Sequence, residues 1–287
     1  MNSTRANRNL KVGGVRRVTQ PIAMTIAGSD SGGGAGIQAD LKTFAAIGVH
    51  GVSAITCLTA QNPREVRAVQ AATPAIVRSQ MEALFAELPP ISLKTGMLFS
   101  EPIIRTVSEV IREFNTTTGS REGGCPWVIV DPVMIATSGA RLLRTSAVRA
   151  MLRLMIPMAD LVTPNLDEAE VLLGWKIDSE EGVRAAAREI HDQFGCAALV
   201  KGGHLKKAKD AVDFYYDGSK ELMLSAPFVR GVSTHGTGCT YSAAITAYLA
   251  EGADLPEAVI QAKGFITRAI QGSIRVGKHS ILRHVQA

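Results

Sequence analysis

The feature that most constrains this chain is a regular alternation of short apolar segments with longer segments of helical periodicity. The segments typical of buried strands are 22–27, 51–59, 91–95, 127–131, 160–163 and 197–201. The segments typical of helices are 37–47, 74–88, 101–114, 145–156, 166–173, 179–194, 238–251 and 256–273. Because neighbouring parallel strands need a crossover, usually a helix, the alternation predicts an α/β fold with a mainly parallel central sheet and helices on both faces.

One pair of predicted strands departs from this alternation. Residues 211–216 and 221–225 flank Asp217-Gly218, a dipeptide typical of tight hairpin turns. We therefore expect an antiparallel hairpin at one edge of the sheet. Residues 115–126 are polar and rich in Gly and Thr, and they are predicted as a surface loop.

The basic charge of the chain is confined to its first twenty residues. The formal net charge is +5, and residues 1–20 hold five basic residues and no acidic one, so residues 21–287 are balanced. We predict a single domain over residues 21–287 and a basic, disordered tail over residues 1–20. An Arg-rich segment without acidic residues is also typical of organellar transit peptides, but a plain tail is the simpler interpretation. A balanced body with 5% aromatic residues argues against a nucleic-acid binder.

The sequence also indicates where the protein works. It contains no run of about 18 uncharged apolar residues, so no membrane-spanning helix is expected. Its four cysteines show no C-x-x-C spacing and no metal-finger pattern, which favours free thiols in a reducing compartment. We therefore predict a cytoplasmic protein.

A glycine-rich turn follows the first predicted strand. Residues 28–36 read GSDSGGGAG, and successive glycines let a ligand approach the backbone closely. The spacing does not match a dinucleotide-binding fingerprint, and no G-x-x-x-x-G-K-[ST] motif occurs in the chain. An ordinary strand-to-helix turn and a ligand-binding loop both remain open for this segment.

A second glycine motif, residues 234–240 (THGTGCT), precedes an apolar helix. Backbone N–H groups at a helix N-terminus carry partial positive charge, so Gly236 and Gly238 are expected to frame an anion site. A cysteine in that first turn is expected to have a lowered pKa, which would suit a nucleophile or a base. We therefore single out Cys239, and we interpret the other cysteines as buried apolar residues.

Charged and amide side chains follow three further strands. Asp131 follows one strand, Asn165 and Glu168 lie on the helical turn after another, and Lys201 ends a third. Taken alone, Asn165 and Glu168 are best explained as a helix cap. Together with Asp131, however, they offer the oxygen ligands that Mg²⁺ takes beside phosphates. Ligands bind at the carboxyl ends of parallel strands, so all these groups and both glycine loops can converge there. Such a set of groups is typical of a phosphoryl-transfer site without a P-loop.

Seven segments resemble, in order, the hydroxymethylpyrimidine/phosphomethylpyrimidine kinases of thiamine biosynthesis, a family of the ribokinase-like superfamily. They are AGSDSGGGAGIQADLKTF (27–44), TAQN (59–62), KTGML (94–98), DPVM (131–134), TPNLDEAEVLLG (163–174), VKGGH (200–204) and THGTGCTYSAAI (234–245). The resemblance implies a three-layer sandwich and a homodimer. It also implies ATP- and Mg²⁺-dependent phosphorylation of 4-amino-5-hydroxymethyl-2-methylpyrimidine, and then of its monophosphate to the diphosphate.

The resemblance also implies a role for individual residues. Substrate contacts are Ala35, Asp40, Gln61, Met97 and Val133, and ATP contacts are Asn165, Lys201 and Thr234. Asp131 and Glu168 are the Mg²⁺ positions, through water; Gly236, Thr237 and Gly238 match the anion hole, and Cys239 matches the catalytic base. Residues 134–143 resemble a mobile flap. The chain departs from the family at Gln61, where Glu is frequent, and in its C-terminal VGKHSILRHVQA, where a G-x-G-P segment is usual.

Two other functions are weighed against this kinase. A pyridoxal kinase with the same type of cysteine site shares the glycine loops, and Gln61 in TAQN favours the pyrimidine. A non-catalytic binder of vitamin precursors is the alternative from a different class. The presence of Asp131, Glu168, Lys201 and Cys239 together argues against it.

Overall fold

The strands form one large mixed sheet and two small hairpins. The structure is a computed structural model that describes residues 9–12, 15–119, 124–134, 143–203, 205, 210–229 and 235–284. Its strands are β1 (Asn9–Val12), β2 (Val15–Val18), β3 (Ile22–Asp30), β4 (His50–Gln61), β5 (Val66–Ala71), β6 (Ser92–Thr95), β7 (Trp127–Val130), β8 (Leu161–Val162), β9 (Ala197–Lys201), β10 (Asp210–Tyr216), β11 (Glu221–Pro227), β12 (Ile274–Val276) and β13 (His279–Ile281). Its α-helices are α1 (Gly36–Ile47), α2 (Pro74–Glu87), α3 (Glu101–Thr118), α4 (Thr145–Ala150), α5 (Leu166–Leu173), α6 (Glu180–Phe194), α7 (Thr237–Ala250) and α8 (Leu255–Gln271).

The central sheet confirms the predicted α/β class. Among the described residues it has nine strands in the order β11-β10-β9-β8-β7-β6-β3-β4-β5. The strands from β9 through β4 pair in parallel, and β5, β10 and β11 pair antiparallel at the two edges. The predicted hairpin at one edge is therefore present as β10 and β11.

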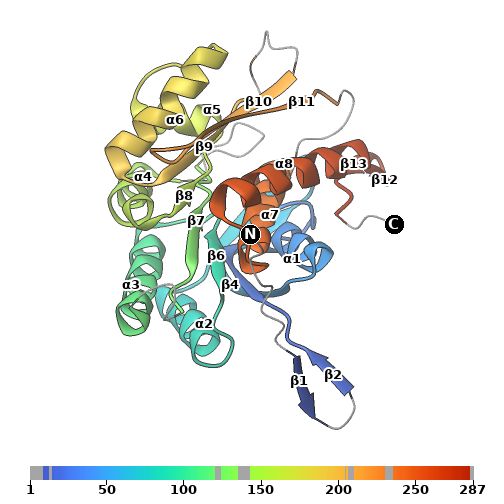
Figure 1. Ribbon diagram of the computed structural model, residues 1–287. Coiled ribbons are helices and arrows are strands. Elements are labelled where there is room, and N and C mark those ends of the chain that lie inside the picture. Colours follow the sequence, from blue (N-terminus) through green and yellow to red (C-terminus); the bar gives the residue numbers. More distant parts are fainter. Residues whose placement is uncertain are drawn as a thin grey trace.

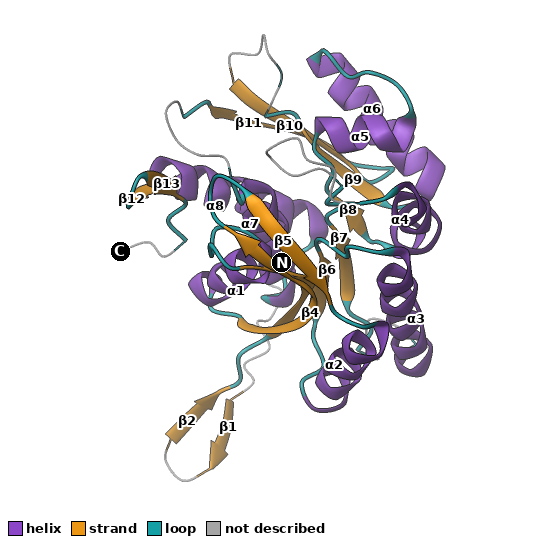
Figure 2. Cartoon of the chain, turned by 180° about the vertical axis from the view of Figure 1, so that it is seen from behind, coloured by secondary structure: helices purple, strands orange, loops and turns teal. Residues whose placement is uncertain are grey.

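Helices cover both faces of this sheet. Helices α2 to α6 lie on one face, and α1, α7 and α8 lie on the other (Figures 1 and 2). Strand β7 shows how the strand period of two supplies both layers, because Val128 and Val130 enter the core on the α2–α6 side while Ile129 enters the core on the α7–α8 side. A three-layer sandwich follows, and it places the carboxyl ends of β3, β6, β7, β8 and β9 along one edge of the sheet.

Some segments differ from the sequence prediction. Helix α3 continues to Thr118, where a loop was expected from residue 115, and Thr116 and Thr117 donate side-chain hydrogen bonds back to the carbonyls four residues earlier. The helix predicted over 145–156 begins as α4 and then widens into a π-helical turn at Met151–Met155. Strands β5, β12 and β13 were not predicted, because most of their residues are exposed and carry no buried alternation.

The basic N-terminal segment was expected to be disordered. In the structure its residues 9–12 and 15–18 form β1 and β2, which pair antiparallel with each other. This hairpin is a sheet of its own and projects away from the sandwich (Figure 1).

Candidate active site

The glycine-rich turn after β3 folds tightly against the strand it leaves. Gly36 opens α1 with φ of 56°, and a Cβ at this position would lie 2.4 Å from the carbonyl oxygen of Gly28. Only glycine fits such an approach in this conformation. The loop between Gly28 and Gly36 is called here the first glycine loop.

Asp30 organises the first glycine loop. Its Oδ1 accepts the N–H of Gly32 at 2.8 Å, and its Oδ2 accepts those of Gly34 at 3.1 Å and Ala35 at 2.8 Å. Burial alone would raise the pKa of Asp30, but the hydrogen bonds from His235, Gly32 and Ala35 outweigh it and lower the pKa. The loop is therefore built around an ionised carboxylate. The sequence analysis did not select Asp30, although a carboxylate at the start of a glycine loop is a readable signal.

The second glycine loop is the turn that opens α7. Gly236 is the N-cap with φ of 82°, and a Cβ there would lie 1.8 Å from the carbonyl oxygen of Gly34. The two glycine loops are therefore in direct backbone contact, as their shared role in the sequence analysis predicted. A Cβ on Gly238 would lie 3.3 Å from Lys201 Nζ and 4.0 Å from Asp131 Oδ2. The helix N-terminus, the lysine and the aspartate thus surround one small space.

Cys239 lies in the first turn of α7, beside this space. Its sulfur accepts a hydrogen bond from the N–H of Gly36. The sequence analysis predicted a lowered pKa for this thiol, and that prediction is wrong for the structure. Burial raises the pKa of Cys239 to about 12, and the nearby carboxylates of Asp40 and Asp131 add to the increase, while Lys94 opposes it. The thiol of Cys239 is therefore neutral in this structure.

Asp131, which is buried, and Lys201, which is partly buried, form an ion pair at the edge of the sheet. Lys201 Nζ lies 3.2 Å from Asp131 Oδ1, while Ser242 of α7 donates to Asp131 Oδ2 at 3.2 Å. Thr163 also donates to Oδ1, at 3.3 Å. Burial opposes the charge on Lys201, but Asp131 and Glu168 outweigh it and raise the pKa of the lysine. Lys201 therefore stays protonated and can offer N–H groups to an anion.

Asn165 and Glu168 form the capping box that the sequence suggested. Asn165 Oδ1 accepts the N–H of Glu168 at 2.9 Å, and Glu168 Oε2 accepts the N–H of Asn165 at 3.0 Å. Glu168 Oε1 also accepts the N–H of Met134 at 3.3 Å. Burial raises the pKa of Glu168 to about 7, with Lys201 opposing and Asp131 adding to the increase. Glu168 is thus a carboxylate that exchanges its proton near neutral pH.

The residues expected to contact substrate fall into two groups. Ala35, Gln61, Met97 and Val133 are all partly buried, so each keeps some accessible surface. Asp40 is fully buried: its Oδ2 accepts Thr25 Oγ1 at 2.6 Å and Lys94 Nζ at 2.9 Å. Its Oδ1 has no hydrogen-bond partner among the described residues. Burial opposes the charge on Lys94, but Asp40, Cys239 and Asp131 outweigh it and raise its pKa, so Lys94 is a buried cation that the sequence analysis missed.

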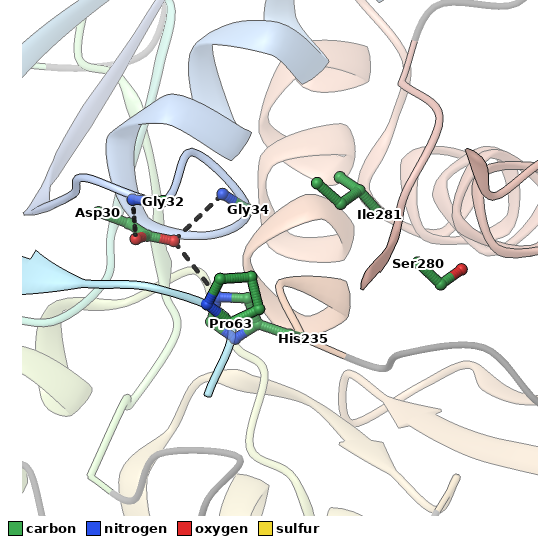
Figure 3. A pocket seen from close by; sticks show the side chains of 7 residues that line it. All are labelled: Asp30, Gly32, Gly34, Pro63, His235, Ser280 and Ile281. Atoms are coloured by element: carbon green, nitrogen blue, oxygen red, sulfur yellow. Dashed lines mark hydrogen bonds and ion pairs between the residues drawn. The ribbon is translucent and has the colours of Figure 1, made fainter. Parts of the chain in front are cut away.

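A shallow pocket lies against the outer side of both glycine loops. Its lining residues are Asp30, Gly32, Gly34, Pro63, His235, Ser280 and Ile281 (Figure 3). His235 Nε2 lies 3.3 Å from Asp30 Oδ2 and 3.4 Å from Gln61 Nε2. Ser280 and Ile281 belong to the C-terminal hairpin, whose atypical sequence gave no sign of this position. Thr234 and residues 135–142 of the expected flap lie outside the described residues.

No metal centre made of protein side chains alone is present in the described ranges. Within them, no three His, Cys, Asp or Glu side chains are grouped closely enough to hold a metal ion. Asp131 and Glu168 are two carboxylates near one lysine. Such a pair suits a hard cation that keeps most of its water ligands.

Comparison with known proteins agrees with this geometry. A family model described as phosphomethylpyrimidine kinase matches residues 30–284. The hydroxymethylpyrimidine/phosphomethylpyrimidine kinase of Rhizobium meliloti is 46% identical over 89% of the chain and 92% of its own length. A bifunctional thiamine biosynthesis protein of Geobacter sulfurreducens is 44% identical over 92% of the chain, which spans 52% of that longer protein.

Two solved structures extend the comparison. The phosphomethylpyrimidine kinase of Clostridium difficile is 40% identical and superimposes with a TM-score of 0.75, covering 88% of this chain and 100% of that one. An ADP complex of Bacillus subtilis pyridoxal kinase is 35% identical with a TM-score of 0.81, covering 93% of this chain and 98% of that one. This chain has the ribokinase-like fold of these enzymes and belongs to the phosphomethylpyrimidine kinase family of phosphotransferases.

Proposed function

We propose that this protein transfers the γ-phosphoryl group of ATP to the hydroxymethyl group of 4-amino-5-hydroxymethyl-2-methylpyrimidine, and then phosphorylates the resulting monophosphate. The observation that carries the proposal is the contact between the two glycine loops beside Gly238, Lys201 and Asp131. A transferring phosphoryl group needs positioning and charge stabilisation more than covalent chemistry. Oriented N–H groups of α7 and the ammonium of Lys201 supply both.

Cys239 is the proposed base for the acceptor hydroxyl. The thiol is neutral at rest, so it must first release its own proton to solvent, and the resulting thiolate then accepts the proton of the acceptor hydroxyl. The nearby Lys94 and the backbone N–H of Gly36 on the sulfur both favour the thiolate form of Cys239. Gly236, Thr237 and Gly238 are the proposed anion hole.

Mg²⁺ is the proposed metal. Asp131 and Glu168 would hold it through water, and their oxygen donors, burial and proximity to Lys201 fit a hydrated hard cation. When bound, Mg²⁺ supplies charge neutralisation between the phosphates. Lys201, Asn165 and Thr234 are the proposed contacts to ATP.

The acceptor site is proposed on the other side of Cys239. Ala35, Met97 and Val133 offer apolar surface, and Gln61 offers a carboxamide that can both donate and accept. Asp40 Oδ1 is a buried acceptor without a partner in the described chain, which suits an amino group of a ligand reaching that depth. Asp40 and Gln61 are therefore the proposed contacts for the aminopyrimidine.

Pyridoxal is the second candidate acceptor. Pyridoxal kinases of Bacillus subtilis and Staphylococcus aureus superimpose with a TM-score of 0.81 at 35% and 34% identity. A site shaped for one six-membered heteroaromatic alcohol can accept another, so substrate preference has to be measured.

Steady-state kinetics with ATP and Mg²⁺ test the proposal. We expect a kcat/KM for hydroxymethylpyrimidine at least about tenfold above that for pyridoxal, corresponding to about 1.4 kcal/mol of transition-state discrimination. Lys201→Ala should abolish most turnover, with Lys220→Ala, an exposed lysine remote from the site, as the matched control. A preference for pyridoxal would replace the proposed substrate, and ligand binding without turnover would favour the non-catalytic binder.

Two further properties are proposed with the function. Among the described residues, no helix combines the length and apolarity needed to cross a bilayer. We expect a cytoplasmic homodimer, and sedimentation velocity at micromolar concentration tests the dimer.

A further inference from the structure

A hydrogen-bonded pair of side chains joins the two glycine loops. Asp30 lies at the end of β3, and His235 immediately precedes the N-cap of α7, 205 residues further along the chain. His235 Nε2 approaches Asp30 Oδ2 at 3.3 Å, and Oδ2 is the same oxygen that accepts the N–H groups of Gly34 and Ala35 (Figure 3). One carboxylate therefore contacts both loops.

The Asp30–His235 pair adds a side-chain link to the backbone contacts that already join the two loops. Glycine backbone loses more conformational freedom on ordering than any other residue, and both loops are rich in it. The Gly34 carbonyl contacts Gly236, and the N–H of Gly36 donates to the sulfur of Cys239. The imidazole of His235 packs over Gly34, because a Cβ on that glycine would lie 3.0 Å from its Cδ2. The histidine thus covers the junction and ties it to Asp30.

The charge of Asp30 determines which ring nitrogen of His235 carries the N–H. An ionised carboxylate can only accept, so the N–H of His235 is assigned to Nε2, pointing at Asp30. The same Nε2 lies 3.4 Å from Gln61 Nε2 and then has no lone pair to offer that amide. This ring nitrogen is consequently not an acceptor for Gln61.

We propose that Asp30 and His235 form a positioning clasp that sets the distance between the acceptor loop carrying Ala35 and the α7 N-terminus carrying Gly238 and Cys239. The proposal rests on the proposed function in one respect, which is that the first glycine loop binds the acceptor and the N-terminus of α7 binds the phosphoryl group. Neither residue touches the reacting atoms. The clasp acts on kcat, since a misplacement of about 1 Å in a near-attack geometry costs on the order of 100-fold in rate.

Kinetics of four variants test the clasp. His235→Ala should lower kcat about 10- to 100-fold for both phosphorylations while the KM for ATP changes less than about threefold, because Lys201 and α5 are not moved. His235→Gln keeps an N–H donor that can reach Asp30 and should recover part of the loss. Asp30→Asn should be at least as slow as His235→Ala, because it also replaces an oxygen that accepts N–H groups of the first glycine loop. The matched control is His50→Ala, an exposed histidine at the start of β4, which should behave as wild type.

Two measurements separate positioning from general instability. The double variant Asp30→Asn/His235→Ala should be no slower than the slower single variant, because both changes remove one interaction. Amide hydrogen exchange in the unliganded protein should be faster in His235→Ala for peptides covering residues 28–37 and 236–241, and unchanged in α3 and α6. This exchange measurement needs no substrate, so it tests the clasp even if the proposed acceptor is wrong.

The proposal is overturned by any of three results. These are a kcat of His235→Ala within about twofold of wild type, multiplicative effects of the two single changes, or loop exchange identical to wild type.

Discussion

At the scale of single residues, burial and the local helix dipole have opposite effects on the pKa of Cys239. The sequence places Cys239 at a helix N-terminus, where a lowered pKa is expected. In the folded chain the loss of water around the thiol outweighs the helix terminus and Lys94, and the pKa rises to about 12. If Cys239 is the proposed base, its thiol must therefore lose a proton before it can accept one.

Replacing Cys239 by Ala tests its role directly. We expect kcat to fall at least about 100-fold with the affinity for the pyrimidine nearly unchanged, since positioned proton transfer contributes about 10²- to 10⁴-fold. Cys125→Ala, a partly buried cysteine outside the site, is the control. Single-turnover kinetics and equilibrium titration measure the two quantities. Near-normal turnover in Cys239→Ala would remove the cysteine from the base role.

The buried Lys94–Asp40 pair gives a prediction about stability. Lys94→Met leaves an unpaired carboxylate in a fully buried position and should cost about 3–5 kcal/mol of unfolding free energy. The double variant Lys94→Met/Asp40→Asn removes both charges and should recover at least half of that loss. Arg105→Met breaks an exposed pair with Glu101 and should cost less than about 1 kcal/mol. Urea unfolding measures all three; a double variant as unstable as Lys94→Met would contradict the argument.

The packing of the helices and strands brings the two glycine loops into contact. The two glycines at the start of α7, the N-cap Gly236 and Gly238, have different roles there. Gly236 has a left-handed φ and touches the Gly34 carbonyl, so Gly236→Ala combines strain with a backbone clash. We expect it to cost about 2 kcal/mol or more. A Cβ on Gly238 would press on the movable end of Lys201 at 3.3 Å and reach Asp131 Oδ2 at an ordinary 4.0 Å, so Gly238→Ala should fold normally and lose activity by narrowing the anion hole. Thermal unfolding and kinetics distinguish them, and equal stability of the two variants would contradict this division.

The helices and strands that bury an apolar face were predicted from the sequence. The strands that are mostly exposed were not predicted. The parallel strands and most helices were found within a few residues, because each carries an apolar pattern. Strands β5, β12 and β13 are short or exposed, and only their hydrogen-bonding neighbours define them. In the site, positions such as Asp131 and Lys201 were predicted from their place at strand ends, and the structure brings them together. His235 and Lys94 act through partners distant in sequence, which no local pattern shows, whereas Asp30 stands at the start of a glycine loop and could have been selected.

On the scale of the whole molecule, the C-terminal segment returns to the active-site helix. His284 is buried, and its Nε2 lies 3.0 Å from Thr240 Oγ1 in the first turn of α7. Burial lowers the pKa of His284 to about 4, with Lys42 adding to the decrease. The atypical C-terminal sequence therefore places a neutral histidine against the first turn of α7.

This buried histidine predicts a specific loss of stability in acid. The unfolded chain takes up a proton on His284 near pH 6.5 and the native chain only near pH 4, so its stabilising contribution is present above pH 6.5 and is lost as the pH falls toward 4. Between pH 7.5 and 5 wild type should lose about 2 kcal/mol more than His284→Gln. Urea unfolding at both pH values measures the difference, and parallel losses in the two proteins would contradict it.

The division of charge between the N-terminal segment and the sandwich gives the last prediction. The five basic residues responsible for the net charge lie within residues 1–20, while the family match begins at residue 30. Strands β1 and β2 pair only with each other, and the central sheet begins at Ile22, after the Pro21 carbonyl has accepted the N–H of His50. A chain lacking residues 1–20 keeps that bond, so its kcat/KM should stay within about twofold of the full chain and its Tm within about 2 °C. The proposed phosphate contacts are the N-terminus of α7 and Lys201, which both proteins keep. The salt dependence of the KM for ATP should therefore also be the same in both proteins. A lower Tm or a weaker ATP interaction in the shortened chain would show that the segment belongs to the kinase domain.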